Sequence, residues 1–91
     1  MSAAPTPEER TAQAIMILQS VAEDTGIPRN IRRAANEAIK MLQRKDLSPG
    51  LRAANAISIL DEVATDPNMP LFARTKIWQA ISILEQIRDQ T

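Results

Sequence analysis

A repeat with a shift of 42 residues is the feature of this sequence that most limits what it can fold into. When residues 12–43 are aligned with residues 54–85, thirteen of the 32 positions are identical and the alignment contains no gap. The identical positions are mostly alanine, isoleucine, leucine and valine, but one aspartate, one proline and one arginine also recur. A duplicated segment of this length is typical of one supersecondary unit used twice. We therefore expect two similar halves that pack against each other.

Each half has the sequence pattern of a hairpin of two helices. Residues 6–9, TPEE, form a capping box, in which the threonine and the last glutamate accept hydrogen bonds from each other's backbone amides. Residues 48–49, SP, repeat the pattern of a capping residue followed by proline. Pro28 and Pro70 mark the start of the second helix in each half. We predict helices over residues 7–24, 28–45, 49–65 and 70–89.

The apolar residues of each predicted helix fall on one side, as expected for helices that share a core. The chain has two glycines, no cysteine and 44% hydrophobic residues, a composition typical of a helical protein. Because the turns are short, consecutive helices are expected to be antiparallel neighbours. We therefore predict an all-α fold, a compact four-helix bundle made of two repeated antiparallel hairpins. The hairpins are residues 7–45 and 49–90, in a single domain over residues 7–91 that follows a flexible tail at residues 1–6.

The residue types that most enzymes use for catalysis are missing. The sequence contains no histidine, cysteine or tyrosine, so the commonest acid–base group and the thiol nucleophile are absent. Zinc sites need histidine or cysteine ligands, and the chain has no glycine-rich phosphate-binding loop. We therefore expect a protein that is not an enzyme, with no catalytic residues, no cofactor, no metal and no small-molecule substrate.

Nothing in the sequence points to a membrane or to secretion. The longest apolar run is AIMIL, residues 14–18, far short of the roughly 20 residues that a membrane span requires. The first ten residues lack the basic start and apolar core of a signal peptide. The absence of cysteine fits an intracellular protein. We expect a cytoplasmic location and no membrane contact.

Positive charge is concentrated in the middle of a chain whose net charge is zero. Residues 1–28 carry a net charge of −3, residues 29–52 carry +5, and residues 53–91 carry −2. On a helical wheel, a group of basic and amide side chains lies opposite the apolar side of the second predicted helix. This basic face consists of Arg29, Arg33, Asn36, Lys40 and Arg44.

The repeat separates residues that both halves keep from residues that only one half has. Four members of the basic face, Arg29, Arg33, Asn36 and Lys40, align with Leu71, Thr75, Trp78 and Ser82 in the second half, so their charges are not part of the repeated pattern. Two interpretations of the basic face stay open. It is either an ordinary solvated surface or a surface that binds the phosphates of nucleic acid or an acidic protein partner.

Leu71 and Trp78 lie seven residues apart on the fourth predicted helix and point away from its apolar side. A single tryptophan at the edge of a bundle is commonly packed under a neighbouring helix. If Trp78 is exposed instead, it is a candidate contact for a protein partner, because tryptophan is enriched at interface hot spots. Both alternatives remain open at this point.

One charged pair recurs in both halves. Asp24 and Arg32 align with Asp66 and Arg74, and each pair spans the turn of its hairpin. An aspartate that ends one helix and an arginine that begins the next are each unfavourably placed in the dipole of their own helix. We therefore predict that Asp24–Arg32 and Asp66–Arg74 form structural ion pairs across the two turns.

Two segments carry a resemblance to a known family. EDTGIPRNIRRAANEAI, residues 23–39, and DPNMPLFARTKIWQAI, residues 66–81, resemble the hallmark segments of a small archaeal family of about ninety residues without an assigned function. The hairpins also resemble HEAT-type helical hairpins in the Asp, Pro and Arg around the turn. The family resemblance covers nearly the whole chain and implies a compact four-helix fold in the archaeal cytosol. It implies no catalytic residue, cofactor or substrate.

These features favour a non-enzymatic interaction module that is part of, or accessory to, a larger intracellular assembly. Its partner would be another protein or a second copy of the chain. The alternative function is RNA or DNA binding through the basic face, because a helix, a glycine-containing turn and PRNIRRAANEAIK, residues 28–40, resemble a helix-turn-helix. In that arrangement Arg29, Asn30, Arg33 and Asn36 would meet phosphates or base edges.

Overall fold

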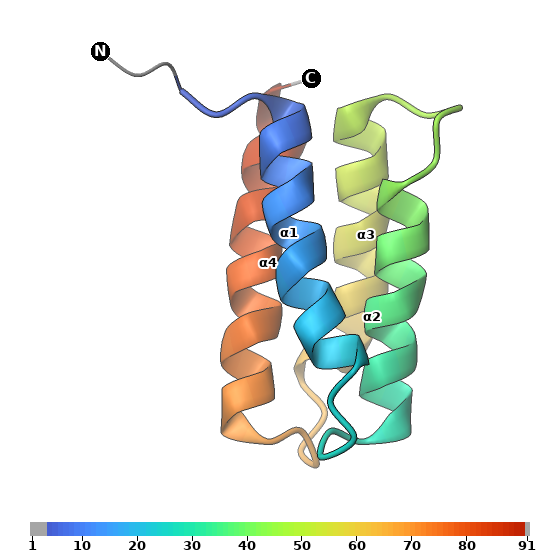
Figure 1. Cartoon of the computed structure of the whole chain (residues 1–91), viewed down its shortest axis with the longest axis vertical. Helices are drawn as coiled ribbons and strands as arrows, with labels where there is room; N and C mark the ends of the chain where they lie inside the picture. Colours follow the sequence, from blue (N-terminus) through green and yellow to red (C-terminus); the bar gives the residue numbers. More distant parts are fainter. Residues whose placement is uncertain (1–3, 91) are drawn as a thin grey trace.

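The computed structural model of the chain describes residues 4–90, and these residues form four helices and no strand. The helices are α1 (Pro7–Ala22), α2 (Arg29–Leu42), α3 (Pro49–Ala64) and α4 (Leu71–Gln90) (Figure 1). Each helix contacts the two helices beside it, whereas α2 and α4 make no contact with each other within the described residues. The four helices therefore form a square bundle in which α2 and α4 occupy opposite corners. The predicted all-α four-helix bundle is confirmed.

The starts of α1 and α3 agree with the predicted starts, and the other helix ends differ from the predicted ends by one to three residues. At the start of α1, the Thr6 hydroxyl accepts from the Glu9 amide at 3.1 Å and the Glu9 carboxylate accepts from the Thr6 amide at 3.0 Å. The predicted capping box is therefore present. At the start of α3, the Ser48 hydroxyl accepts from the Leu51 amide at 3.3 Å. The predicted tail at residues 1–6 lies partly outside the described residues, as does the last residue of the predicted domain, Thr91.

The core is built from equivalent residues of the two halves. Leu18 and Leu60 are both fully buried, and so are the repeated alanines Ala14 and Ala56. Small residues at these positions let the helices approach closely. No polar or charged residue is buried as a whole among the described residues, although the Nε atoms of Arg52 and Arg74 are buried. None of the helices within residues 4–90 has the length and apolar character needed to cross a membrane.

The two hairpin turns lie at the same end of the bundle and have the same internal construction (Figure 1). In the first turn the Asp24 carboxylate accepts from the Gly26 amide at 2.8 Å, and in the second the Asp66 carboxylate accepts from the Asn68 amide at 2.8 Å. Each turn also buries one apolar side chain, which is Ile27 or Met69 at equivalent positions. These contacts fix the angle at which α2 and α4 begin.

The repeated arginines bind backbone oxygens rather than the aspartates. Arg32 Nε donates to the Ile27 carbonyl at 2.8 Å, and Arg74 Nη2 donates to the Asp66 carbonyl at 2.9 Å. Within residues 4–90, no ion pair joins Arg32 to Asp24 or Arg74 to Asp66. The predicted ion pairs are therefore replaced by hydrogen bonds to the main chain. The physical reason is that both carboxylates already accept from amides of their own turns, while the turn carbonyls need a donor.

Candidate binding surfaces

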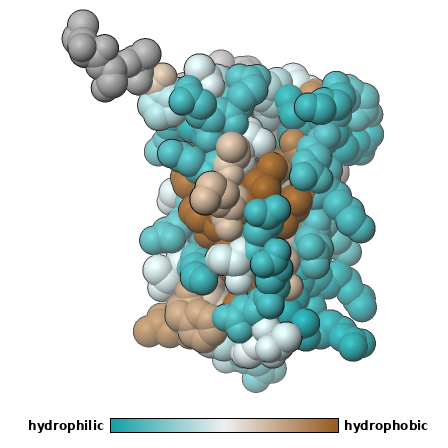
Figure 2. All heavy atoms as spheres, in the orientation of Figure 1, coloured by the Kyte–Doolittle hydropathy of each residue, from teal (hydrophilic) through white to brown (hydrophobic). Residues whose placement is uncertain are grey.

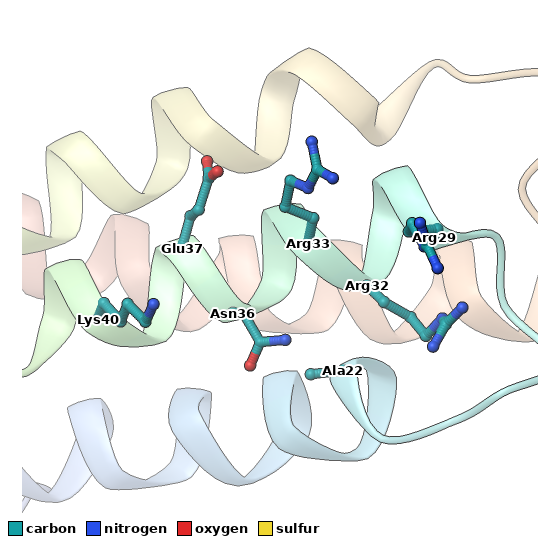
Figure 3. A pocket seen from close by; sticks show the side chains of 7 residues that line it. All are labelled: Ala22, Arg29, Arg32, Arg33, Asn36, Glu37 and Lys40. Carbon is teal, nitrogen blue, oxygen red and sulfur yellow. The ribbon is translucent and has the colours of Figure 1, made fainter.

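The basic face of α2 borders an open depression of about 500 Å³, which we call the basic depression. Its lining residues come from α2 and the end of α1: Ala22, Arg29, Arg32, Arg33, Asn36, Glu37 and Lys40. Arg33 and Glu37 point toward α3, whereas Asn36 points toward α1 (Figure 3). The positive charges are therefore spread over the exposed width of α2 rather than along a single line.

Three cations of the basic depression have no protein partner. Within residues 4–90, Arg29, Arg33 and Lys40 form no ion pair and no side-chain hydrogen bond. Arg32 is different, because it is held by the Ile27 carbonyl. Glu37 is an acidic side chain on the edge of the same surface. The depression therefore presents four positive charges, three of which have no partner within the described residues, and one negative charge.

Arg44 does not line the basic depression. Its Nε donates to the Asp46 carboxylate at 3.0 Å, and the two residues form an ion pair in the α2–α3 connection. The hydrogen bond from Arg44 lowers the pKa of the Asp46 carboxyl and raises the pKa of Arg44. Sequence reasoning grouped Arg44 with the basic face because the predicted helix continued to residue 45. Since α2 ends at Leu42, Arg44 lies outside the helix, and the helical wheel does not give the direction of its side chain.

The start of α2 carries positive charge that no acidic residue of its first turn offsets. Its N-cap, Pro28, makes no side-chain capping bond, and its first turn contains no acidic residue. By contrast, α1 has Glu8 and Glu9 in its first turn. The first amides of a helix carry partial positive charge, so the dipole of α2 adds to the charge of Arg29 instead of offsetting it.

Asn30 is unavailable for the role that the helix-turn-helix interpretation gave it. Its Nδ2 donates to the Asp66 carboxylate at 2.8 Å, which ties α2 to the second turn. In addition, α1 and α2 run antiparallel side by side (Figure 1), whereas the helices of a helix-turn-helix cross at about 90–120°. The helix-turn-helix interpretation is therefore wrong.

A second open depression, of about 410 Å³, lies on the outer side of α4 and is called the apolar depression here. Its lining residues are Leu71, Arg74, Thr75, Trp78, Gln79 and Ser82. Leu71 is 79% exposed and Trp78 is 47% exposed, so Trp78 is not packed under a neighbouring helix. Hydrophobic atoms gather at the surface where α4 begins (Figure 2).

The two depressions occupy equivalent positions in the two halves. A shift of 42 residues converts each α2 residue of the basic depression into a residue of the apolar depression. Arg32 and Arg74 are the pair that stays the same, and both bind turn carbonyls. The fold therefore builds the same surface shape twice, and the sequence fills one copy with charge and the other with apolar side chains.

Sequence reasoning missed a third depression, of about 440 Å³, between three helices. Arg52 stands at its wall, where Nη1 donates to the Leu42 carbonyl at 3.3 Å. The other lining residues are Glu8, Thr11, Ala12, Ile15, Gln43 and Lys45, together with Leu42 itself. No sequence signal could have grouped them, because α1, α2, α3 and the α2–α3 connection meet there only through tertiary packing. Among residues 4–90, no group of three or more acidic side chains is placed to hold a metal ion.

Comparison with known proteins identifies relatives of nearly full length. Residues 1–87 match the family model described as Uncharacterised protein family (UPF0147). A UPF0147 protein of Metallosphaera sedula is 58% identical over 82 residues, which cover 90% of this chain and 92% of that protein. A UPF0147 protein of Sulfolobus acidocaldarius is 52% identical over 89 residues, which cover 98% of this chain and 100% of that protein.

Two crystal structures have the same fold. One, described as that of the unknown function protein MMP1188, matches with a TM-score of 0.88 and 38% identity, and covers 92% of this chain and 96% of that chain. The other is that of a protein from uncharacterized family UPF0147 from Thermoplasma acidophilum. It matches with a TM-score of 0.84 and 32% identity, and the match covers 89% of this chain and 95% of that chain. The resemblance to a small archaeal family is confirmed, whereas the likeness to HEAT-type hairpins stays a prediction. The chain belongs to the uncharacterised protein family UPF0147.

Proposed function

We propose that the protein is a non-enzymatic interaction module that joins a larger assembly through the apolar depression on α4. The observation that carries this proposal is the exposure of Leu71 and Trp78 at positions where the equivalent residues of α2 are Arg29 and Asn36. Since a charged and a polar side chain serve equally well at these positions in the first half, the fold does not need apolar residues there. Exposed tryptophan is a common anchor of protein interfaces.

The apolar depression is too small to make a stable interface by itself. A large aromatic side chain buries about 150–250 Å² when fully covered, and Trp78 is already half-buried. A stable interface covers about 800 Å² on each partner. Leu71 and Trp78 supply a minor part of that area, so the remaining contacts must come from a partner that extends over neighbouring surface.

The repeat provides the variants that test this proposal. Trp78→Asn and Leu71→Arg replace each residue of α4 with the equivalent residue of α2, Asn36 or Arg29. Because α2 forms with these residues, both variants should keep the fold. Met16→Ser is the matched control, because Met16 is also exposed and its equivalent residue is Ser58. A photoactivatable cross-linker at position 75 would join the protein in native lysate to whichever chain covers the depression.

We expect one cross-linked protein that co-purifies with the wild-type chain and with Met16→Ser, and that is lost with Trp78→Asn. Light scattering of the purified chain should give the mass of a monomer. A partner that is retained by Trp78→Asn and Leu71→Arg would contradict the proposal. If the purified chain forms a stable dimer and Trp78→Asn makes it monomeric, the partner at the apolar depression is a second copy of the chain.

Nucleic-acid binding by α2 is the second candidate function. The observation in its favour is the group of three cations, Arg29, Arg33 and Lys40, that have no partner within the described residues. Nuclease treatment of the lysate separates the two candidates, because a protein contact on α4 survives it. The side chains on the surface of α2 also indicate which kind of nucleic acid it would bind.

A further inference from the structure

We infer that the basic depression on α2 binds the sugar–phosphate backbone of double-stranded nucleic acid without reading its base sequence. The inference goes beyond the protein-contact function of α4 and concerns the opposite corner of the bundle. It rests on four features of α2: the free cations, the field at the start of the helix, the absence of aromatic side chains and the position of α2 between its neighbours.

The fold gains nothing from the three free cations. The residues equivalent to Arg29, Arg33 and Lys40 in the second half are Leu, Thr and Ser, and α4 forms without positive charge at these positions. Arg29 is even unfavourably placed, because a cation at the N-terminus of a helix is repelled by the helix dipole. A charge that the fold does not need, and that lacks a counterion within the described chain, is available for an anion outside it.

The start of α2 reinforces this attraction. The helix has no side-chain cap and no acid in its first turn, and Arg29 is its first residue, so the positive end of the helix dipole lies next to this cation. Helix N-termini and arginine side chains both prefer phosphate oxygens. Measured along the helix axis, Arg29 and Lys40 are about 16 Å apart, at 1.5 Å for each of eleven residues. That length corresponds to roughly five steps of a duplex at 3.4 Å each.

The surface lacks the groups that hold single strands. Proteins that bind single-stranded nucleic acid stack the bases on aromatic side chains. The chain has two aromatic residues, Phe72 and Trp78, and both lie on α4, which makes no contact with α2 within the described residues. The partner of α2 is therefore a nucleic acid whose bases are already stacked on one another.

Base reading requires a helix that enters a groove, and α2 is not free to do so. The major groove of B-DNA is about 12 Å wide and admits a single helix. Both α1 and α3 pack against α2 and form the adjacent walls of the bundle. Asn30, the amide nearest the start of the helix, is held by Asp66. The cations of α2 therefore meet phosphates, and these contacts carry no sequence information.

Fluorescence anisotropy of the full chain tests this inference. The probes are two unrelated DNA duplexes and one RNA duplex of about 20 base pairs, a single strand of the same length and a glutamate-rich peptide. With three phosphate contacts, the slope of log affinity against log salt should be about −2.7. The affinity for a duplex should therefore fall about 40-fold between roughly 50 and 200 mM salt. We expect equal affinity for the two DNA sequences and weaker binding of the single strand.

Arg33→Thr and Lys40→Ser are the variants of choice, because they insert the residues of the second half. Each should make the slope less steep by about one unit. Lys76→Ala on α4 removes the same charge elsewhere and should leave the slope unchanged. Arg29→Ala should weaken duplex binding and, at the same time, leave the melting temperature equal to or above that of the wild type, which shows that the loss is not caused by unfolding.

Three results would overturn the inference. The first is no binding of any duplex at the lowest salt concentration. The second is a slope that Arg33→Thr and Lys40→Ser do not change. The third is binding of the glutamate-rich peptide in preference to every duplex, which would assign the basic depression to an acidic protein. None of these results affects the partner test on Trp78, so the two proposals can fail separately.

Discussion

Leu18 and Leu60 occupy equivalent places in the two halves, and both are fully buried in the core. A buried leucine contributes through the apolar surface that it removes from water and through close packing with its neighbours. In a domain of 91 residues the total stability is about 5–15 kcal/mol, so one such residue accounts for a large share of it.

Leu18→Ala and Leu60→Ala should each lower the free energy of unfolding by about 2–5 kcal/mol, because each leaves a cavity that the helices only partly fill. Chemical denaturation followed by circular dichroism measures the change. Met16→Ala, at an exposed position of α1, should have an effect below about 0.5 kcal/mol. Similar losses at position 16 and position 18 would contradict the packing described above.

Arg32 illustrates how a residue can be structural in a way that its sequence position does not reveal. The repeat predicts a partner across the turn, and the most obvious partner is the carboxylate of Asp24. In the structure the Asp24 carboxylate accepts from the Gly26 amide, and Arg32 donates to the Ile27 carbonyl. The two residues therefore stabilise the same turn independently.

A double-mutant cycle distinguishes these two arrangements. Arg32→Met should destabilise the fold, since the Ile27 carbonyl loses its donor, and Asp24→Ala should destabilise it by freeing the Gly26 amide. Because the two side chains do not bind each other, coupling should come only from the turn that they share and should stay below about 1 kcal/mol. A coupling energy above about 1 kcal/mol would indicate that Asp24 and Arg32 form an ion pair after all.

At the scale of the element, each helix begins at a group of hydrogen bonds that includes a charged side chain or a hydroxyl. The carboxylate of Glu9 closes the cap of α1, and the carboxylate of Asp66 supports the turn that leads into α4. The hydrogen bond from the Thr6 backbone lowers the pKa of Glu9. The hydrogen bond from the Asn68 backbone, followed by the one from Asn30, lowers the pKa of Asp66.

These lowered pKa values predict that the fold loses stability in acid. A carboxylate whose pKa is lower in the folded chain than in the unfolded chain stabilises the fold above the unfolded pKa, roughly pH 4. Its contribution disappears as the pH falls through the lowered folded pKa. The melting temperature should therefore drop between about pH 5 and pH 2.

Asp66→Asn should reduce this drop, because it removes one of the groups that must be protonated. Asp61→Asn on the exposed side of α3 is the control with the same change of charge. Thermal unfolding at a series of pH values, followed by circular dichroism, measures both. If the melting temperature falls equally in the wild type and in Asp66→Asn, Asp66 does not contribute to the loss of stability in acid.

At the scale of the whole molecule, duplication places the same depression at two opposite corners of the bundle. The first copy is basic and the second is apolar. Within the described residues, α2 and α4 make no contact with each other. A link between them runs through Asp66, which accepts hydrogen bonds from Asn30 of α2 and from Arg74 of α4, but Arg33, Lys40 and Trp78 take no part in that link.

The two surfaces should therefore act independently. Trp78→Asn should leave the affinity for duplexes unchanged, and the double variant Arg33→Thr, Lys40→Ser should leave the α4 partner bound. Effects of mutations at distant sites without shared partners are additive. Anisotropy and co-purification on the same set of variants measure both activities. Loss of both activities in either variant would indicate a single composite site.

The helices, the repeat and the bundle could all be predicted from the amino-acid sequence. Capping residues such as Thr6 and the spacing of apolar residues act locally, within a few residues along the chain, and local signals can be read without the fold. The basic face of α2 could also be predicted, because its members lie on one helix. Arg44 was placed wrongly, since the end of α2 depends on the α2–α3 connection.

Which side chains are free, and which surfaces face each other, depends on the packing of the helices in three dimensions. The exposure of Trp78, the pairing of Arg44 with Asp46 and the capture of Asn30 by Asp66 all depend on how helices and turns approach one another in space. That approach results from the packing of many core side chains at once. A sequence pattern specifies which side of a helix is apolar, but the neighbours of its polar side are fixed only when the bundle closes.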